Sequence, residues 1–382
     1  MLIVADENIP LLDAFFDDMG TIRRVSGRDL TPADVADADI LLVRSVTRVD
    51  RQLLEGSRVK FVGTATIGTD HVDTEWLAGQ SIAFASAPGC NASSVVEYVI
   101  SILSIYAEQR GHDDWSDLSV GVVGAGNVGQ RLADTLGRLG FQVRRYDPPR
   151  QQAEPGEDFA TLEDVLACDV ISLHTPLTDD GDCPTRHMID TDRLATLNAS
   201  QLLINSGRGG VVDCQALKGR LAQPEPPWAV LDVWEGEPAV DPELARMLWL
   251  ITPHIAGYSL EGKVGGTERI YQALCRFLGL PARKKSGQFM ADPALSKLSF
   301  TASATAQEAA HLAIRACYDV RRDDARYRRV LDLPESERAA AFDAMRRDYP
   351  VRREFSSTKV QLKGGAKDLQ QVFKALAFKL KT

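Results

Sequence analysis

The stretch LSVGVVGAGNVGQRLADTLGRL, residues 118–139, passes from an apolar run through a glycine-rich loop into a helical pattern. The run Leu118–Val123 is short and β-branched, which predicts a buried strand. The loop that follows has the spacing G-x-G-x-x-G, at Gly124, Gly126 and Gly129. After the loop, apolar residues recur at helical spacing. A strand, this loop and a helix in that order form the dinucleotide-binding fingerprint of an α/β domain.

The glycines of this loop have separate roles in the fingerprint. Gly124 permits the tight turn, Gly126 lets a pyrophosphate approach the backbone, and Gly129 lets the helix pack on the strand. Asn127 and Val128 begin the helix, whose free N–H groups and partial positive charge favour phosphate. We therefore predict that these five residues bind the pyrophosphate of a dinucleotide.

An acidic residue, Asp147, ends the strand predicted after the loop. At this spacing, a carboxylate can accept hydrogen bonds from the adenosine ribose and would repel a 2′-phosphate, so we expect NAD rather than NADP. Three nearby arginines, Arg144, Arg145 and Arg150, weaken that preference. The alternative is that Asp147 only begins the turn that follows.

Downstream of the loop, an arginine, a carboxylate and an imidazole occur in that order. Arg208 lies in NSGRG, Glu237 in DVWEGEP and His254 in TPHIAG. An arginine can bind a carboxylate through two parallel hydrogen bonds, and a histidine can take a hydroxyl proton near neutral pH. A glutamate beside the histidine can orient the ring and favour its protonated form. Behind a dinucleotide loop, this set predicts hydride transfer from a hydroxy acid. The alternative is three unrelated surface residues.

Short apolar runs alternate with helical patterns over most of the chain, which is typical of a parallel α/β sheet. In the first part, strands are predicted at Leu2–Ala5, Ile40–Val43, Phe61–Gly63 and Ile82–Ala85, and helices at Pro10–Met19 and Asp73–Gly79. The long helix predicted at Ser93–Arg110 links this part to a second one. Strands of the second part are predicted at Leu118–Val123, Phe141–Tyr146, Asp169–Leu173, Gln201–Asn205, Trp228–Asp232 and Leu248–Ile251. We expect a helix at Thr267–Leu280 to return to the first sheet.

The composition changes after Pro281, where the basic stretch Arg283–Gly287 predicts a linker. Beyond it, we predict strands at Leu298–Ala302 and Ser357–Leu362 and helices at Ala304–Tyr318, Glu335–Arg347 and Lys367–Leu380. This pattern indicates a separate α+β domain. Its arginine-rich part, residues 315–353, is interpreted as a solvated helix face or a salt-bridged dimer surface, with a phosphate-facing patch as the alternative.

The bulk composition argues against several classes of protein. A net charge of −9 over 382 residues disfavours general nucleic-acid binding, which needs a basic face. No apolar run is long enough to suggest a membrane span. The six cysteines are single, so neither a metal site nor a disulfide framework is expected. Since no basic leader opens the chain, we expect a cytoplasmic protein with reduced thiols.

Five motifs give roughly residues 1–285 a resemblance to the NAD-dependent D-isomer-specific 2-hydroxyacid dehydrogenases. The motifs are residues 124–129, 174–176, 205–209, 232–238 and 252–257. The resemblance implies a Rossmann-type NAD domain at 96–256, inserted in a flavodoxin-like substrate domain made of 1–95 and 257–285. It also implies that residues 286–382 form a C-terminal α+β dimerisation domain, and therefore a homodimer.

The resemblance further implies roles for single residues. Arg208 would bind substrate, Glu237 would be the partner of the histidine, and His254 would be the acid/base. Further substrate contacts would come from Ser45, Thr66 and Tyr258. Besides the glycine loop, NAD contacts would come from Asp147, Thr175, Ser206, Gly207, Arg208, Asp232 and Gly257. His174 either contacts NAD or makes a structural hydrogen bond.

Three N-terminal motifs and the extra C-terminal unit narrow the resemblance to a branch that acts on a phosphorylated hydroxy acid. The motifs are ADENIP at 5–10, VRSVT at 43–47 and ATIGTDH at 65–71. We expect Arg44 or Arg48 to hold the phosphate, with backbone N–H groups of residues 67–69 as a further anion nest. Three alternatives stay open: another dehydrogenase of the family, such as one for phosphoglycerate, an NAD-sensing protein without turnover, and a nucleic-acid role for the arginine-rich tail.

Overall fold

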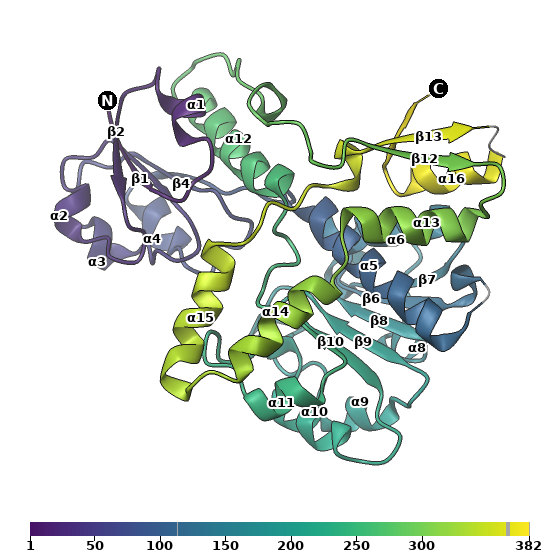
Figure 1. Ribbon diagram of the computed structural model, residues 1–382. Coiled ribbons are helices and arrows are strands. Elements are labelled where there is room, and N and C mark those ends of the chain that lie inside the picture. The colour runs from purple at the N-terminus through teal and green to yellow at the C-terminus, as the bar shows by residue number, and fades with distance from the viewer. Residues whose placement is uncertain (113, 364–366, 382) are drawn as a thin grey trace. The chain divides into compact units, whose positions relative to one another are not determined.

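The structure, a computed structural model, describes residues 1–112, 114–363 and 367–381 (Figure 1). The chain forms two compact units. Unit 1 comprises residues 1–92 and 259–292, and unit 2 comprises residues 93–258 and 293–382. The boundaries predicted after residues 95 and 256 thus fall after residues 92 and 258. Each unit is assembled from two separate stretches of the chain.

Unit 1 is built on a parallel sheet in the order β2-β1-β3-β4-β5, which is the flavodoxin-like order. Its strands are β1 (Leu2–Asp6), β2 (Thr21–Val25), β3 (Ile40–Val43), β4 (Phe61–Thr64) and β5 (Ala83–Ala85). β3 and β4 are buried throughout, as their apolar sequences predict. The edge strand β2 was not predicted, because its sequence TIRRV carries two arginines and is only partly buried.

Helices cover both faces of this sheet. α1 (Leu12–Phe16) and α12 (Leu260–Phe277) share one core with Ile3, Ile40 and Phe61. On the other face, α2 (Pro32–Val35), α3 (Arg51–Leu54) and α4 (Thr74–Gly79) contribute to a core with Val4 and Leu41. The predicted return of a helix to the first sheet is confirmed, since α12 belongs to unit 1. A short turn, η3 (Ser286–Gln288), follows it.

Unit 2 contains a six-stranded parallel sheet in the order β11-β10-β9-β8-β6-β7. The strands are β6 (Ser119–Val123), β7 (Gln142–Tyr146), β8 (Val170–Leu173), β9 (Leu202–Asn205), β10 (Trp228–Leu231) and β11 (Leu250–Ile251). Side chains alternate between two cores: Val170 faces one, and Ile171 faces the other. Both faces are therefore apolar, as a buried parallel sheet requires.

Helices also cover both faces of the six-stranded sheet. α5 (Ala92–Arg110) and α6 (Asn127–Arg138) contribute to the first core. The second core takes side chains from α8 (Leu162–Leu166), α9 (Thr191–Thr196), α10 (Cys214–Leu221) and α11 (Pro242–Met247). The remaining short elements are α7 (Pro148–Ala153), η1 (Trp115–Asp117) and η2 (Gly209–Val211).

The strand order places a topological switch point at β6. Its neighbours are β7 on one side and β8 on the other, so the connections after β6 and β8 diverge. Ligands of open α/β sheets bind in the crevice that such a divergence leaves at the carboxyl ends of the strands. The glycine loop follows β6, and residues 174–176 follow β8. The fold thus brings two of the recognised motifs to this crevice.

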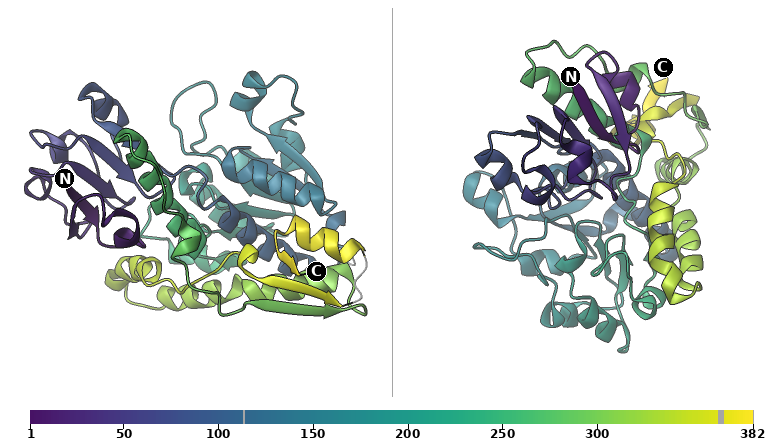
Figure 2. Two further views of the ribbon diagram at one scale, coloured as in Figure 1. Left: turned by 90° about the horizontal axis from the view of Figure 1, so that it is seen from above. Right: turned by 90° about the vertical axis from the view of Figure 1, so that its left-hand side faces the viewer.

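The C-terminal segment has a small parallel sheet of its own, β12-β13-β14, with its strands at Lys297–Thr301, Lys359–Lys363 and Lys379–Lys381. Its helices are α13 (Ala306–Cys317), α14 (Arg321–Leu331), α15 (Glu335–Arg347) and α16 (Lys367–Ala375), with the turn η4 (Phe355–Ser357). α14 and α15 run side by side, in yellow-green in Figure 2. The helix predicted through Leu380 ends at Ala375, and Ala377 then takes a left-handed φ of 61°.

This segment is not a third compact unit, although the sequence suggested a separate domain at 286–382. It clusters with the nucleotide-binding part in unit 2. The reason is shared burial: α13 and α16 place Ile314 and Phe373 in the core that also contains α5 and α6. α14 and α15 place Tyr327 and Phe342 in the core on the other face. α14 itself was not predicted, because its sequence RRDDARYRRVL is dominated by charge.

One arginine of the segment is buried at the junction with the first half of unit 2. Arg352 donates to the carbonyl oxygens of Ser94 and Ala256 at 2.7 and 3.1 Å. Its guanidinium lies 3.6 Å from the centroid of the Tyr318 ring. The interpretation of residues 315–353 as a solvated helix face is therefore wrong for Arg352, which is buried and lies 4.0 Å from a carboxylate oxygen of Glu97. Arg321, by contrast, pairs with an aspartate.

Candidate active site

Arg208, Glu237 and His254 line a single cavity of about 240 Å³ in unit 2. They lie in the loops that follow β9, β10 and β11, which are neighbours in the sheet. Because adjacent parallel strands end at the same edge, their loops meet there. Residues separated by 46 positions in sequence are thereby brought to one site. The prediction that these three act together gains its geometric basis from this order of strands.

His254 and Glu237 form a hydrogen-bonded pair, with Nδ1 and Oε2 2.8 Å apart. An ionised carboxylate can only accept, so Nδ1–H donates and Nε2 is left with its lone pair. The other oxygen of Glu237 accepts from the Trp234 N–H at 2.7 Å. Burial opposes ionisation of Glu237, but its hydrogen bonds with His254 and Trp234 outweigh burial and lower its pKa. This pair can therefore remove a proton through Nε2 and stabilise the imidazolium that results.

His254 has a φ of 57°, in the left-handed region that few residues other than glycine adopt. Asp232 holds it there: the Asp232 carbonyl accepts from the His254 N–H at 2.7 Å. The Asp232 carboxylate accepts from Thr252 Oγ1 at 2.6 Å and from the N–H groups of Ile255 and Ala256 at 2.7 and 3.0 Å. Asp232 is therefore an anchor of the histidine loop. Its predicted contact with NAD stays a prediction.

A close approach of two loops places Arg208 beside the Glu237 loop. A Cβ added at Gly209 would lie 2.1 Å from the carbonyl carbon and oxygen of Trp234, so only glycine fits. The preceding turn is fixed by Asn205, whose Nδ2 donates to the Arg208 carbonyl at 2.9 Å. Gly209 thus sets the position from which the Arg208 side chain reaches the cavity.

The glycine loop has the geometry that its sequence predicts. Gly124 has a φ of 86°, and a Cβ at Gly129 would lie 1.9 Å from the Gly124 carbonyl oxygen. Gly126 is the N-cap of α6, and the space where its Cβ would point is open. Free N–H groups of this helix therefore face room for a phosphate, which fits the pyrophosphate of a dinucleotide.

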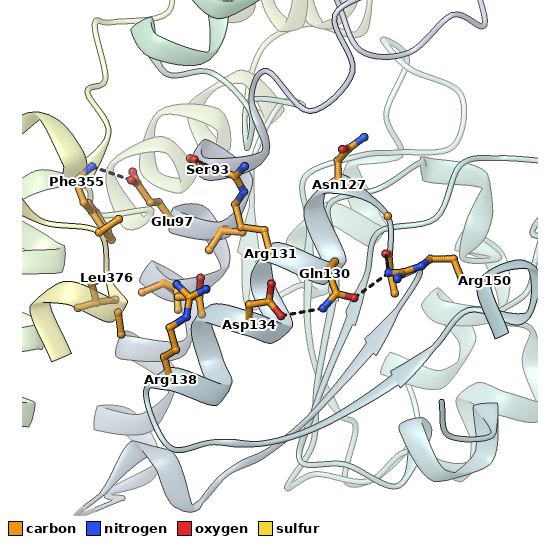
Figure 3. A pocket seen from close by; sticks show the side chains of 17 residues that line it. Ser93, Glu97, Asn127, Gln130, Arg131, Asp134, Arg138, Arg150, Phe355 and Leu376 are labelled. Atoms are coloured by element: carbon orange, nitrogen blue, oxygen red, sulfur yellow. Dashed lines mark hydrogen bonds between the residues drawn. The ribbon is translucent and has the colours of Figure 1, made fainter. Parts of the chain in front are cut away.

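A larger cavity of about 740 Å³ begins at the same loop and lies between α5, α6 and the end of α16 (Figure 3). Asn127, Gln130 and Asp134 line it from α6, and Arg150 borders it near the glycine loop. Its lining does not include the arginine, glutamate and histidine of the smaller cavity. The predicted catalytic residues therefore lie in the smaller cavity, at the strand ends.

Asp147 is the N-cap of α7, which is the turn-starting role left open by the sequence. Its carboxylate accepts from the N–H groups of Ala125 and Arg150 at 2.8 and 3.0 Å. Each oxygen keeps a further lone pair that a ribose hydroxyl can use. The arginines around it are engaged: Arg145 pairs with Glu157, and Arg150 donates to the Ala125 carbonyl.

The loop after β8 contains two residues with different roles. His174 lies 2.8 Å from Ser172 Oγ and 3.4 Å from Ser206 Oγ, so the structural hydrogen bond is present. Burial lowers the pKa of His174 to about 3, which keeps it neutral. Within the described residues, the Oγ1 of Thr175 is buried and has no hydrogen-bond partner. Such an orphaned hydroxyl fits a group that a bound cofactor would satisfy.

The predicted substrate residues are divided between the units. Ser45 and Thr66 belong to unit 1, where each lies two residues beyond a strand, β3 and β4. Ser45 is exposed, and Thr66 Oγ1 lies 2.8 Å from Thr64 Oγ1. Tyr258 and its neighbour Gly257 belong to unit 2. No motif pointed to Arg186, which lines the same cavity as Arg208 and is ion-paired with an aspartate.

The chain is similar to known proteins over its whole length. The family described as the NAD-binding domain of D-isomer-specific 2-hydroxyacid dehydrogenases matches residues 105–256, and a domain of unknown function (DUF3410) matches residues 289–376. An erythronate-4-phosphate dehydrogenase of Marinobacter nauticus is 65% identical, with 100% of both chains covered. That of Hahella chejuensis is 50% identical, with 100% of this chain and 99% of the relative covered.

Solved structures support the fold over 73% of the chain. D-lactate dehydrogenase of Aquifex aeolicus, complexed with NAD and lactic acid, is 22% identical, with a TM-score of 0.59. It covers 73% of this chain and 96% of its own. 3-Phosphoglycerate dehydrogenase of Entamoeba histolytica has a TM-score of 0.60 at 22% identity. This match covers 73% of this chain and 95% of the other. These matches confirm the predicted Rossmann-type α/β fold. From its full-length relatives, the chain belongs to the erythronate-4-phosphate dehydrogenase family, within the D-isomer-specific 2-hydroxyacid dehydrogenases.

Proposed function

We propose that the protein oxidises the C2 hydroxyl of 4-phospho-D-erythronate with NAD, giving 2-oxo-3-hydroxy-4-phosphobutanoate, a step of pyridoxal 5′-phosphate biosynthesis. Relatives that match the whole chain are named for this substrate. The observation that carries the chemistry is the 2.8 Å contact between His254 and Glu237 in a cavity that Arg208 also lines.

In this reaction, His254 acts as the base. Its Nε2 takes the C2 hydroxyl proton, while Glu237 holds Nδ1 and stabilises the imidazolium. Arg208 binds the substrate carboxylate through parallel hydrogen bonds and polarises the oxygen that becomes the carbonyl. NAD, when bound, accepts the hydride that leaves C2. The proton and the hydride together balance the oxidation of an alcohol to a ketone.

The residues proposed to hold NAD fit its parts. The N–H groups at Gly126–Gly129 would bind the pyrophosphate, and Asp147 would accept from the adenosine ribose. Thr175 would gain the partner that its buried hydroxyl needs. Contacts from Ser206, Gly207 and Gly257 belong to the same proposal. Because a carboxylate repels a 2′-phosphate, and the nearby arginines are engaged with other groups, NAD is favoured over NADP.

The substrate contacts of Ser45, Thr66 and Tyr258, a homodimer formed through the C-terminal segment and a cytoplasmic location complete the proposal. They are supported by the resemblance of these residues and of the segment to the family. Among the helices in the described residues, none combines the length and apolar character needed to cross a membrane.

The test is a panel of 2-hydroxy acids with NAD or NADP, followed by NADH or NADPH absorbance. We expect 4-phospho-D-erythronate to be oxidised with the highest kcat/KM, ahead of 3-phosphoglycerate, D-erythronate and D-lactate. A higher kcat/KM for 3-phosphoglycerate would favour the alternative that the protein is a phosphoglycerate dehydrogenase. Binding of NAD with no turnover of any acid would favour a sensor and overturn the proposal.

A further inference from the structure

Arg346 is a cation of the C-terminal segment that lies over the ring of Tyr258, and its charge interacts with that of Glu237. It belongs to the last turn of α15, and its guanidinium lies 5.8 Å from the centroid of the Tyr258 ring. Tyr258 is four residues after His254 and packs edge-on against Tyr349 at 5.7 Å. An arginine over an aromatic face is held in place while its N–H groups stay available to a ligand.

The Arg346 side chain hydrogen-bonds with Tyr258 but leaves one of its donors unused. Its Nε is buried and, among the described residues, finds no hydrogen-bond partner. A buried donor without a partner is costly and is usually explained by a ligand or water that satisfies it. Burial lowers the pKa of the guanidinium, but the electrostatic interactions with Tyr258 and Glu237 outweigh burial and raise it. Arg346 is therefore a fixed positive charge in the field of the catalytic pair.

Arg346 lies outside the part of the chain that matches the NAD-binding domain of the D-isomer-specific 2-hydroxyacid dehydrogenases. That domain matches residues 105–256, whereas Arg346 belongs to the separate match over residues 289–376. The C-terminal segment thus adds a cation near Glu237 and Tyr258, which lie in or just beyond the NAD-binding match.

We infer that Arg346 binds the distal phosphate of the substrate. The inference rests on the proposed function, since it assigns a residue to the phosphate of that substrate. Arg208 is committed to the carboxylate, and Arg186 is ion-paired with Asp179. The phosphorus is four bonds from C2, so the group that binds it must lie close to His254. A guanidinium supplies the forked donors that match two phosphate oxygens.

The earlier expectation for the phosphate named Arg44 or Arg48. Arg48 is 84% exposed and pairs with Asp50 at 2.8 Å, which suits a surface ion pair. Arg44 is half-buried and stays a second candidate in unit 1. The competing role for Arg346 is structural. In that role, Arg346 would only hold the Tyr258 ring in place and stabilise the negative charge of Glu237. That role predicts equal losses with every substrate.

The test compares four variants with the wild type: Arg346→Met, Arg346→Lys, Arg44→Ala, and Arg347→Met as the control. Arg347 is the neighbouring exposed arginine, which pairs with Asp348. For each, kcat/KM is measured with 4-phospho-D-erythronate and with D-erythronate. We expect Arg346→Met to lower the ratio of the two values roughly 10- to 100-fold. Arg346→Lys should recover part of that loss, and the control should retain the wild-type ratio.

Calorimetric titration of the NAD-bound protein with inorganic phosphate gives a second readout. Arg346→Met should weaken phosphate binding at least about tenfold, whereas binding of oxalate, which has only carboxylates, should change much less. An unchanged ratio with unchanged phosphate binding, or equal losses with both substrates, would overturn the inference. If the wild type does not oxidise 4-phospho-D-erythronate, the proposed function fails, whereas the phosphate titration still tests Arg346 separately.

Discussion

At the scale of single residues, the site depends on a histidine in an uncommon backbone conformation. His254 has a φ of 57°, and Asp232 accepts four hydrogen bonds from the surrounding turn. A left-handed residue costs about 1–3 kcal/mol and persists where its surroundings over-determine it. The short turn at 252–256 therefore fixes the direction of the imidazole before any substrate arrives.

Replacement of the base should separate chemistry from cofactor binding. We expect His254→Ala to lower kcat by roughly 10²- to 10⁴-fold, because no other group replaces Nε2. The dissociation constant of NAD, measured by fluorescence titration, should change little. Glu237→Gln should give a smaller loss of kcat, since its side chain can still hold Nδ1. An equal loss of turnover and of NAD affinity in His254→Ala would count against the acid/base role.

The buried His174 should make stability depend on pH. The pKa of His174 in the folded protein is lowered to about 3 from an ordinary 6.5. Below pH 6.5, the unfolded chain therefore binds a proton at this residue that the folded chain does not bind. Stability should fall as pH decreases from 6.5 towards 3, by up to about 1.4 kcal/mol per pH unit from this residue. Urea unfolding of the wild type and of His174→Gln at pH 7 and pH 5 measures how much His174 contributes to the pH dependence of the free energy of unfolding. Parallel pH dependence in both proteins would contradict it.

Motifs singled out Arg208, Glu237 and His254, and the structure brings the three to one cavity, while their catalytic roles stay predictions. The anchoring role of Asp232 could not be predicted, because it depends on which N–H groups a turn presents. Asp147 was ambiguous for the same reason: one carboxylate can cap a helix and also accept from a ribose. Arg346 had no motif at all, and only the course of α15 reveals its neighbours.

At the scale of elements, strand order explains how the site is assembled. β9, β10 and β11 are adjacent, so the three catalytic loops leave one edge of the sheet. The fully apolar strands were predictable because an apolar composition directly indicates burial. β2, α14 and β14 were not, since arginine and lysine dominate their sequences and their structure is set by neighbouring elements.

Contact between two catalytic loops should be sensitive to one methyl group. Gly209→Ala would place a Cβ about 2.1 Å from the Trp234 carbonyl, so the loop that carries Arg208 must shift. We expect kcat/KM to fall by roughly 100-fold, as a displacement of about 1 Å can cause. The matched control is Gly219→Ala in α10, where the Cβ position is open. Circular dichroism should show that both variants are folded; wild-type activity in Gly209→Ala would refute the argument.

At the scale of the whole molecule, the C-terminal segment completes unit 2. Ile314 and Phe373 are fully buried in the core that also contains α5 and α6. The sequence indicated a separate domain because the linker at Arg283–Gly287 looks like a boundary. Composition shows where a segment begins, but it does not show which apolar face the segment will cover.

Weakening this packing should therefore destabilise unit 2 as a whole. We expect Phe373→Ala to lower the free energy of unfolding by about 3–5 kcal/mol. Lys374→Ala, exposed on the same helix, should change it by less than about 0.5 kcal/mol. Denaturant unfolding followed by tryptophan fluorescence measures both, since four of the five tryptophans, Trp115, Trp228, Trp234 and Trp249, belong to this unit. A C-terminal transition that leaves the tryptophan signal unchanged would show an independent domain.

The two bonds of Arg352 have a consequence for the order of events during synthesis. Unit 1 needs residues 259–292, and unit 2 needs residues 293–382, so neither is complete when its N-terminal stretch leaves the ribosome. Arg352 binds the carbonyls of Ser94 and Ala256, which lie beside two of the three points where the chain passes between units. Domains commonly fold in order as they emerge. Here the turn that carries His254 gains the support of Arg352 only after the C-terminal segment has been translated, so the site is completed by residues that follow it far along the chain.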